Sequence, residues 1–461
     1  MPSPIRAALP IYTTASPNAD IVLSTEPVRL GPPEDGAAGT ATLTLRFLPS
    51  PRLRVSGEYG GGAIELVDRI QASNKTSLTF TNRGITADVL LSSYTFFREP
   101  MPITATVLPG TVDLGDAQAL RHVIFHLINY KDFVVPLASH SLSMQAVLEA
   151  AGWRVTLSPV PRLAGLMAEL RDNGGYAVTH AGRLERLGGE DFTVDSGKLV
   201  LDGLHYFLSF ARGTWSGPCL PVGFDSEGIR CWEQWGIPNT SSFLNPSTWF
   251  DPHNGQLLSE VFPGFHELWA DPLWTPILRR AIFWYVMSNK GEGGVGAVIL
   301  SQTALELLAW FVLVRTTREL SAREFRSLKA AGRLRRLLRH FRIPCQVPGI
   351  LRQLINASIA TQPWHDGPHA LTVVRNNLVH PVPTSDATSV DHLAQYEAWL
   401  LAQWYLELCL LALFNHSRSY SNRMNWDRQV GQVEPVPWMV HGPSDRCADP
   451  PSESATEGST L

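Results

Sequence analysis

The chain has 461 residues, enough for two or three domains that each bury a core of their own. With 44% hydrophobic and 17% charged residues, its composition is that of a folded globular protein and excludes disorder as the dominant state. The formal net charge of −4 argues against nucleic-acid binding through the overall field of the protein, and leaves room for a local basic face.

The cysteines and the apolar segments bear on the cellular compartment. The five cysteines are dispersed without C-x-x-C spacing, which predicts reduced thiols rather than a disulfide framework or a zinc site. We expect no metal and no cofactor. Pro4 and Pro10 interrupt the apolar N-terminal residues, so no signal peptide is expected. Residues 398–414, the most apolar stretch, contain Gln403 and Glu407, which favours a buried helix over a membrane span and predicts a cytoplasmic protein.

The first half of the chain is predicted to be rich in β-strands. In residues 42–47, polar and apolar side chains alternate with the period of two that is typical of a half-buried strand. Further strands are predicted at residues 63–67, 77–81, 85–92, 101–108, 121–129, 154–157 and 198–201, and a helix at 145–151. This spacing predicts a sandwich or a large mixed sheet. The glycines of residues 57–62 lack the lysine of a phosphate loop and predict a turn.

Residues 203–250 are rich in aromatic side chains interleaved with glycine and proline. Such side chains stack on bases or sugars in some proteins. The alternative, which we favour, is a packed core, because aromatic side chains dominate many cores.

From about residue 251 the apolar side chains take helical spacing. Helices are predicted at residues 256–262, 275–288, 295–314, 322–341, 350–360, 369–379 and 389–415, with prolines 263, 344, 348 and 363 at helix ends. Short connections predict an antiparallel bundle. The expected fold is therefore α+β, with a β-rich region over residues 1–250, a helical bundle over 251–418, and an extended segment with a disordered tail over 419–461.

The segment LTVVRNNLVHP, which ends at Pro381, carries the strongest chemical signal. Arg375 and His380 stand about 140° apart around an ideal helix, so periodicity alone does not direct them to one site. A residue before proline is disfavoured in the α region, however, which places His380 at a helix end where it can turn. Histidine moves protons near neutral pH, and arginine holds phosphate oxygens.

This segment, within a C-terminal helical bundle, resembles the R-x4-6-H signature of the HEPN superfamily, including the polar residue that follows the arginine. The resemblance covers about residues 251–418. The order of a β-rich region and such a bundle also resembles ApeA-like bacterial defence proteins.

The resemblance implies a metal-independent endoribonuclease, with Arg375, Asn376 and His380 as catalytic residues in a homodimer. RNA, such as tRNA or another cellular RNA, is the implied substrate, and the β-rich region is an expected sensor for an unknown trigger. Catalytically silent HEPN scaffolds also occur, so the alternative is a dimerisation protein that binds RNA or a protein partner. A third interpretation makes the β-rich region the functional centre.

A basic run over residues 315–342 also favours nucleic acid, because it concentrates positive charge in an acidic chain. Its predicted RNA-binding residues are Arg326, Arg333, Arg336 and Arg339; the alternative is a solvated face. Glu306 is either an accessory polar group of the site or a structural partner of an arginine.

The cluster of His365, Asp366 and His369 suggests a metal site by its spacing. Pro368 favours a helix start instead, with Asp366 as its cap.

Overall fold

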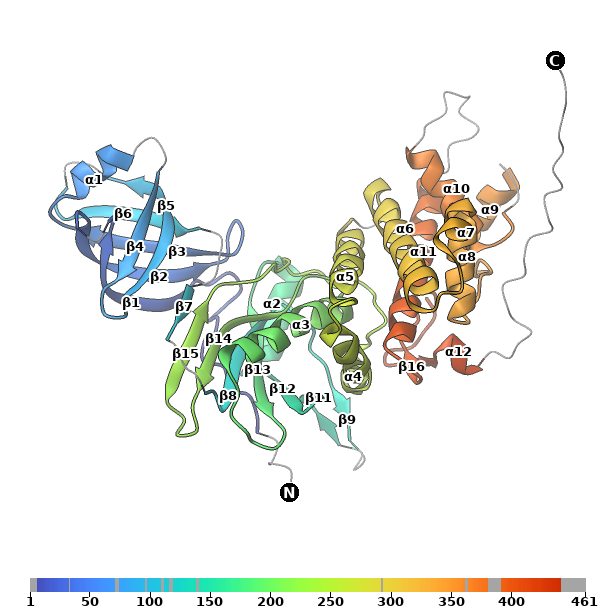
Figure 1. The fold of residues 1–461 in the computed structure, drawn as a ribbon, viewed down its shortest axis with the longest axis horizontal. Helices are drawn as coiled ribbons and strands as arrows, with labels where there is room; N and C mark the ends of the chain where they lie inside the picture. Colours follow the sequence, from blue (N-terminus) through green and yellow to red (C-terminus); the bar gives the residue numbers. More distant parts are fainter. Residues whose placement is uncertain are drawn as a thin grey trace, which may run out of the picture. The chain divides into compact units, whose positions relative to one another are not determined.

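The computed structural model describes residues 6–32, 34–70, 74–95, 98–108, 112–115, 119–137, 141–291, 293–360, 364–379 and 391–440. The chain divides into two compact units. Unit 1 comprises residues 1–208 and 215–245, and unit 2 comprises residues 209–214 and 246–461. The α+β prediction is confirmed in its coarse form, because the N-terminal region is rich in strands and the C-terminal half is helical (Figure 1).

The first part of unit 1 is a closed antiparallel barrel. Its strands, in spatial order, are β1 (Ile21–Leu30), β2 (Ala37–Arg46), β3 (Arg52–Tyr59), β6 (Met101–Val107), β5 (Ile85–Tyr94) and β4 (Lys75–Phe80). In β2, Leu43 and Leu45 are buried and their neighbours Thr42 and Thr44 are not, which confirms the predicted alternation.

The strand predicted at residues 63–67 is wrong, because Ala63–Ile70 form helix α1. Its buried residues Ala63, Leu66 and Val67 follow the i, i+3, i+4 spacing of a helix.

The second part of unit 1 is a seven-stranded antiparallel sheet. Its spatial order is β11 (Ala146–Ala150), β12 (Trp153–Pro159), β13 (Val178–Arg186), β8 (His122–Ile128), β14 (Pro218–Phe224), β15 (Arg230–Trp235) and β7 (Val112–Leu114). Helices α2 (Leu163–Asn173) and α3 (Val194–Arg212) accompany it, and β9 (Val135–Pro136) pairs with β10 (Leu142–Ser143). A barrel and an antiparallel sheet thus stand in place of the predicted sandwich or single large mixed sheet.

Two local predictions in this sheet are wrong. Residues predicted as a helix at 145–151 contain strand β11, which pairs with β12 along its whole length. Residues predicted as a strand at 198–201 lie inside α3. Short apolar segments do not distinguish strand from helix by periodicity alone, and the pairing partner or the longer helix decides.

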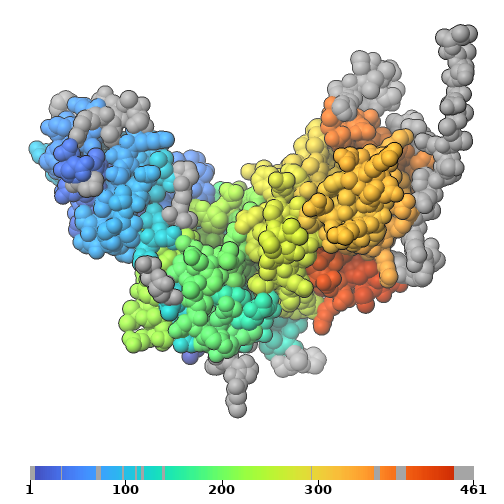
Figure 2. Space-filling model, in the orientation of Figure 1, coloured from blue at the N-terminus to red at the C-terminus, as the bar shows by residue number. Residues whose placement is uncertain are grey.

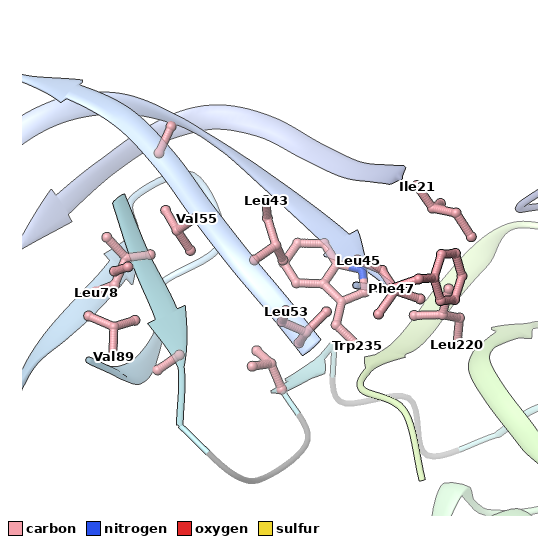
Figure 3. Close-up of a cluster of buried hydrophobic side chains, with 14 of the residues drawn as sticks. Ile21, Leu43, Leu45, Phe47, Leu53, Val55, Leu78, Val89, Leu220 and Trp235 are labelled. Carbon is pink, nitrogen blue, oxygen red and sulfur yellow. The ribbon is translucent and has the colours of Figure 1, made fainter. Parts of the chain in front are cut away.

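The barrel and the sheet of unit 1 share one hydrophobic core (Figure 3). Trp235, at the end of β15, is fully buried among barrel residues that include Leu45 and Leu53, and its ring meets Phe80 edge-on at 5.5 Å. Other aromatic residues of the 203–250 region, such as Phe207 and Trp232, are also buried, which confirms the core interpretation of that region.

Unit 2 is a helical bundle. Its helices are α4 (Gln256–Ala270), α5 (Thr275–Lys290), α6 (Val295–Trp310) with the π-helical turn η2 (Phe311–Thr316), α7 (Ala322–Ser327), α8 (Ala330–His340), α9 (Arg352–Ala360), α10 (Gly367–Val379) and α11 (His392–Leu413). A short 3-10 turn, η1 (Pro252–Asn254), precedes α4, and the pair β16 (Ser419–Tyr420) and β17 (Glu434–Pro435) with α12 (Pro437–Val440) follows α11.

Two helix boundaries differ from the prediction. Pro263 does not end its helix, because α4 continues to Ala270 and buries Phe265 and Trp269 beyond the proline. The single helix predicted over residues 322–341 is two helices, since Leu328 has extended backbone angles and ends α7. The prolines at 344 and 348 do separate α8 from α9, whereas Pro363 and the tail predicted to be disordered lie outside the described residues.

Among the described residues, one helix is long and apolar enough to cross a membrane by length and composition, and it is not the most apolar stretch of the sequence, residues 398–414. It spans Val295–Thr316, with a mean hydropathy of 1.9. In this window 56% of the residues are buried, and the helix packs against α5, α8 and α11 within unit 2. Residues 398–414 lie largely in α11, where every residue from Glu397 to Leu411 is buried, as predicted.

The cysteines depart from the prediction at one position. Cys219, Cys231 and Cys409 are free thiols, whereas Cys345 is disulfide-bonded. The prediction of reduced thiols is therefore wrong for Cys345. Spacing along the chain reveals only pairs that are close in sequence, and a disulfide joins residues that the fold brings together.

Candidate nucleic-acid interface of unit 2

Helix α10 carries residues 375–379 of the R-x4-H segment, and its start is capped by Asp366. The Asp366 Oδ1 atom accepts a hydrogen bond from the His369 backbone N–H at 2.9 Å, as an N-terminal cap does. This contact confirms the predicted capping role of Asp366. The helix then packs against α6, α8 and α11, burying Ala370, Leu371 and Val374.

Asp366 also makes a buried ion pair with Arg335 of α8. Arg335 Nε lies 2.5 Å from Oδ2, and Nη2 lies 3.0 Å from Oδ1. The two side chains are 10% and 7% exposed. This two-pronged contact ties the start of α10 to α8, so one member of the basic run has a structural role. The sequence does indicate that Arg335 is buried, because it lies at helical spacing from the apolar residues Ala331 and Leu338 and so shares their face of α8.

Arg375 has a different environment. It is half-buried near the end of α10, and its Nη1 donates to Asn376 Oδ1 at 3.2 Å. Within the described part of the chain this is its sole hydrogen bond, and it forms no ion pair there. Asn376 is exposed. His380 lies outside the described residues, so the structure brings together two of the three predicted catalytic residues.

The side chains of the basic run differ in their exposure. Helices α7 and α8, in orange, lie on the face of unit 2 that Figure 2 presents. Arg326 and Arg336 are exposed, and Arg339 is partly buried. The exposed basic residues of the run are Arg315, Arg318, Arg323, Arg326, Lys329, Arg336 and Arg342. Exposed cationic side chains of this kind can meet phosphates.

Arg333, the remaining predicted RNA-binding residue, is held within the unit. Its Nε donates to the Phe325 carbonyl at 3.1 Å, and its Nη1 lies 3.5 Å from Glu306 Oε2. Glu306 also accepts a hydrogen bond from Gln302 at 3.0 Å. Of the two roles expected for Glu306, the contacts favour that of a structural partner of an arginine.

The His365 and His369 rings stack with centroids 4.9 Å apart. The His365 backbone N–H donates to His369 Nδ1 at 3.3 Å, so one ring nitrogen is already engaged. In the ranges that the structure describes, no group of three histidine, cysteine or acidic residues is arranged to hold a metal ion. The arrangement fits the helix-start interpretation of this cluster.

The core beneath the interface holds a charged network that sequence analysis missed. Glu407 of α11 is fully buried and accepts hydrogen bonds from Tyr285 at 2.6 Å and from Arg423 Nε at 3.0 Å. Burial lowers the pKa of Arg423, but the Glu407 carboxylate outweighs burial and raises that pKa above its ordinary value. Arg423 follows α11, so residues beyond 418 complete the core of unit 2.

Two domain families match this chain. Residues 271–434 match the YopA C-terminal domain, and residues 115–246 match the YopA central domain. The chain is similar to YopA. The SPbeta prophage-derived uncharacterized protein YopA of Bacillus subtilis (strain 168) is 26% identical over 404 residues, which cover 86% of this chain and 90% of the relative. No solved structure matches the chain significantly.

The matched C-terminal segment contains the features described above. It includes α5 to α11, the R-x4-H segment, and both Glu407 and Arg423. The candidate interface therefore lies inside the segment that matches the YopA C-terminal domain.

Proposed function

We propose that this protein is a metal-independent endoribonuclease of HEPN type, active as a homodimer. The observation that carries the proposal is the state of Arg375. Arg335 in the same bundle is paired with a buried carboxylate, whereas the one hydrogen bond of the Arg375 guanidinium to a described residue goes to the neighbouring Asn376. A guanidinium that forms no ion pair with the described residues, in an R-x4-H segment, is available to bind a phosphate.

The proposed chemistry uses the RNA's own 2′-hydroxyl. Its oxygen attacks the adjacent phosphorus, the bond to the 5′-oxygen breaks, and a 2′,3′-cyclic phosphate remains. The imidazole of His380 accepts the proton of the 2′-hydroxyl, and a proton is returned to the departing 5′-oxygen to give a 5′-hydroxyl end. Imidazole suits this transfer because it titrates near neutral pH. Arg375 stabilises the charge that develops on the phosphate oxygens, and Asn376 orients its guanidinium.

The exposed arginines of α7 and α8 supply the RNA contact in this proposal. Arg326 and Arg336 are the residues best placed by their exposure. We place the protein in the bacterial cytoplasm, where RNA is accessible. Most cytoplasmic proteins lack disulfides, so the disulfide of Cys345 is unusual for this compartment. A role in bacterial defence rests on analogy with ApeA-like proteins alone. The relative in Bacillus subtilis is named as prophage-derived.

The test is cleavage of total cellular RNA and tRNA by purified protein in excess EDTA. Wild type is compared with Arg375→Ala and His380→Ala, and with Arg352→Ala, which removes an exposed arginine from neighbouring helix α9. We expect cyclic-phosphate ends with wild type and the Arg352 variant, and at least a 100-fold loss with the other two.

Absence of cleavage by folded, dimeric wild type across both substrates would contradict the proposal and favour the scaffold alternative. Equal cleavage by all four proteins would show that the R-x4-H residues are not catalytic. Circular dichroism and size-exclusion chromatography of each variant separate loss of catalysis from loss of fold.

A further inference from the structure

Unit 1 contains a cavity of about 310 Å³ at the junction of its barrel and its sheet. Its charged lining consists of Arg83, Arg230 and Glu233. Its apolar lining includes Ile85, Leu114 and Trp232. The volume is at the lower end of the range for small-molecule sites.

The two arginines reach the cavity from different parts of unit 1. Arg83 stands in the turn between β4 and β5 of the barrel, and Arg230 begins β15 of the sheet. Their side chains are 40% and 42% exposed, so both guanidinium groups are open to solvent on one side. They are brought together only by the fold, since 146 residues separate them in the chain.

Glu233 holds both guanidinium groups in place. It is nine-tenths buried, pairs with Arg230, and lies 3.9 Å from Arg83 Nη1. Glu26, itself paired with Arg83 Nε at 3.1 Å, fixes that arginine from the barrel side. Carboxylates behind two arginines restrict their rotamers, which lowers the entropy lost when a ligand binds.

Tyr12 completes the support. Its hydroxyl donates to Glu233 Oε2 at 2.6 Å and accepts from Arg230 Nη2 at 2.8 Å. Burial, followed by the hydrogen bond to Glu233, raises the pKa of Tyr12 to about 12, so the phenol stays protonated. The Glu233 Oε2 atom is therefore occupied by two donors, and the charge of the carboxylate is partly neutralised before any ligand arrives.

Donor groups remain for a ligand. Within the described residues, Arg83 Nη2 and Arg230 Nε and Nη1 have no hydrogen-bond partner. Two guanidinium groups with open N–H donors suit a group that offers several oxygens and more than one negative charge. A phosphoryl group has that geometry, and arginine is its preferred partner.

We propose that this cavity binds the phosphoryl group of a small molecule no larger than a mononucleotide. Ile85 and Leu114 would contact the remainder of the ligand, and the phosphoryl oxygens would join Arg83 of the barrel to Arg230 of the sheet. Binding would stabilise the barrel–sheet junction, which gives the N-terminal region a means to sense a metabolite. The inference goes beyond the proposed ribonuclease activity and does not depend on it.

The experiment measures binding to the full chain by isothermal titration calorimetry and thermal shift. The probes are inorganic phosphate, adenosine monophosphate and adenosine. The variants are Arg83→Gln and Arg230→Gln. The matched control is Arg121→Gln, an arginine of similar exposure that precedes β8, pairs with Asp191 and is not among the residues that line the cavity.

Wild type and the control should bind adenosine monophosphate, phosphate or both, and each cavity variant should lose at least tenfold in affinity. Tighter binding of the nucleotide than of phosphate would identify a nucleoside phosphate as the ligand class. Equal affinity for both would identify the phosphoryl group alone. Binding of adenosine as tight as that of its monophosphate would overturn the proposal.

Hydrogen exchange of wild type provides an independent readout if a variant fails to fold. The ligand should slow exchange at residues 81–85 and 230–233, which carry the two arginines. No binding of any probe at 10 mM, or binding that both cavity variants retain in full, would also overturn the proposal.

Discussion

Arg335 and Asp366 form a buried, two-pronged ion pair that joins helix α8 to the start of α10. The same carboxylate caps α10 through the His369 backbone N–H. The helix that carries Arg375 is therefore positioned by an arginine that sequence alone groups with a basic surface.

Removing Arg335 should destabilise unit 2. Arg335→Ala leaves Asp366 charged and buried without its partner, which costs about 3–5 kcal/mol in the free energy of unfolding. The neighbouring Arg336→Ala, at an exposed position, should change stability by less than about 0.5 kcal/mol. Urea unfolding followed by circular dichroism compares the two. Similar midpoints for both variants would show that the ion pair contributes little.

The residues after α11 should be essential to unit 2. Arg423→Ala leaves the fully buried Glu407 uncompensated, so we expect a loss of about 3–5 kcal/mol. The control is Arg418→Ala, whose side chain is 72% exposed and paired with Glu260. It should cost less than about 1 kcal/mol. A stable protein truncated after residue 418 would contradict this role.

Gly264 lies at a close contact between two helices that leaves no space for a side chain. A Cβ atom at this position of α4 would lie 1.8 Å from the Phe414 carbonyl oxygen at the end of α11, so one backbone must move. Gly264→Ala should destabilise the protein by at least about 1–3 kcal/mol. Gly296→Ala, in α6 with open space around it, should be neutral or stabilising by up to about 1 kcal/mol. Thermal unfolding of both variants checks the opposite signs.

Buried histidines should make unit 1 sensitive to mild acid. Burial lowers the pKa of His126 to about 4 and that of His180 to about 3, against 6.5 when unfolded. His126 Nε2 accepts the backbone N–H groups of Ile11 and Tyr12, both at 3.0 Å, so protonation would break both bonds. Stability is full above pH 6.5 and falls as the unfolded chain takes up protons.

Between pH 6.5 and pH 5, each of these histidines should lower the free energy of unfolding by about 2 kcal/mol. Urea midpoints measured across that window provide the test. A flat profile would mean that the two imidazoles titrate normally in the folded protein.

The exposed arginines should set the salt dependence of RNA binding. The double variant Arg326→Ala/Arg336→Ala should bind RNA more weakly and lower the slope of log K against log salt by about 1.4, the release of two counterions from a single strand. Arg333→Ala should have a smaller effect, because Glu306 and the Phe325 carbonyl hold its guanidinium. Filter binding between 50 and 200 mM salt compares them, with Arg352→Ala as the control for charge alone. An unchanged slope in the double variant would place the RNA elsewhere.

The sequence by itself determined the class of each half of the chain. Alternation at residues 42–47 predicts β2, and helical spacing predicts α5, α9 and α11, because these signals are local. The prolines at 344 and 348 correctly mark the boundary before α9. The capping of α10 by Asp366 and the R-x4-H spacing are local as well. Short apolar segments were misassigned, as at residues 145–151, since only pairing with β12 makes β11 a strand.

Only the tertiary structure decided which polar side chains work together. Arg335 and Asp366 are 31 residues apart, and Tyr12 and Glu233 are 221 residues apart. No local pattern records such pairs, since burial and ion pairing depend on elements that meet after folding. For the same reason, the sequence does not distinguish Arg333, which pairs with Glu306, from the exposed Arg336 three residues away. The sequence shows which residues are charged. The fold decides whether a charged side chain forms an ion pair inside the protein or remains exposed to bind a ligand.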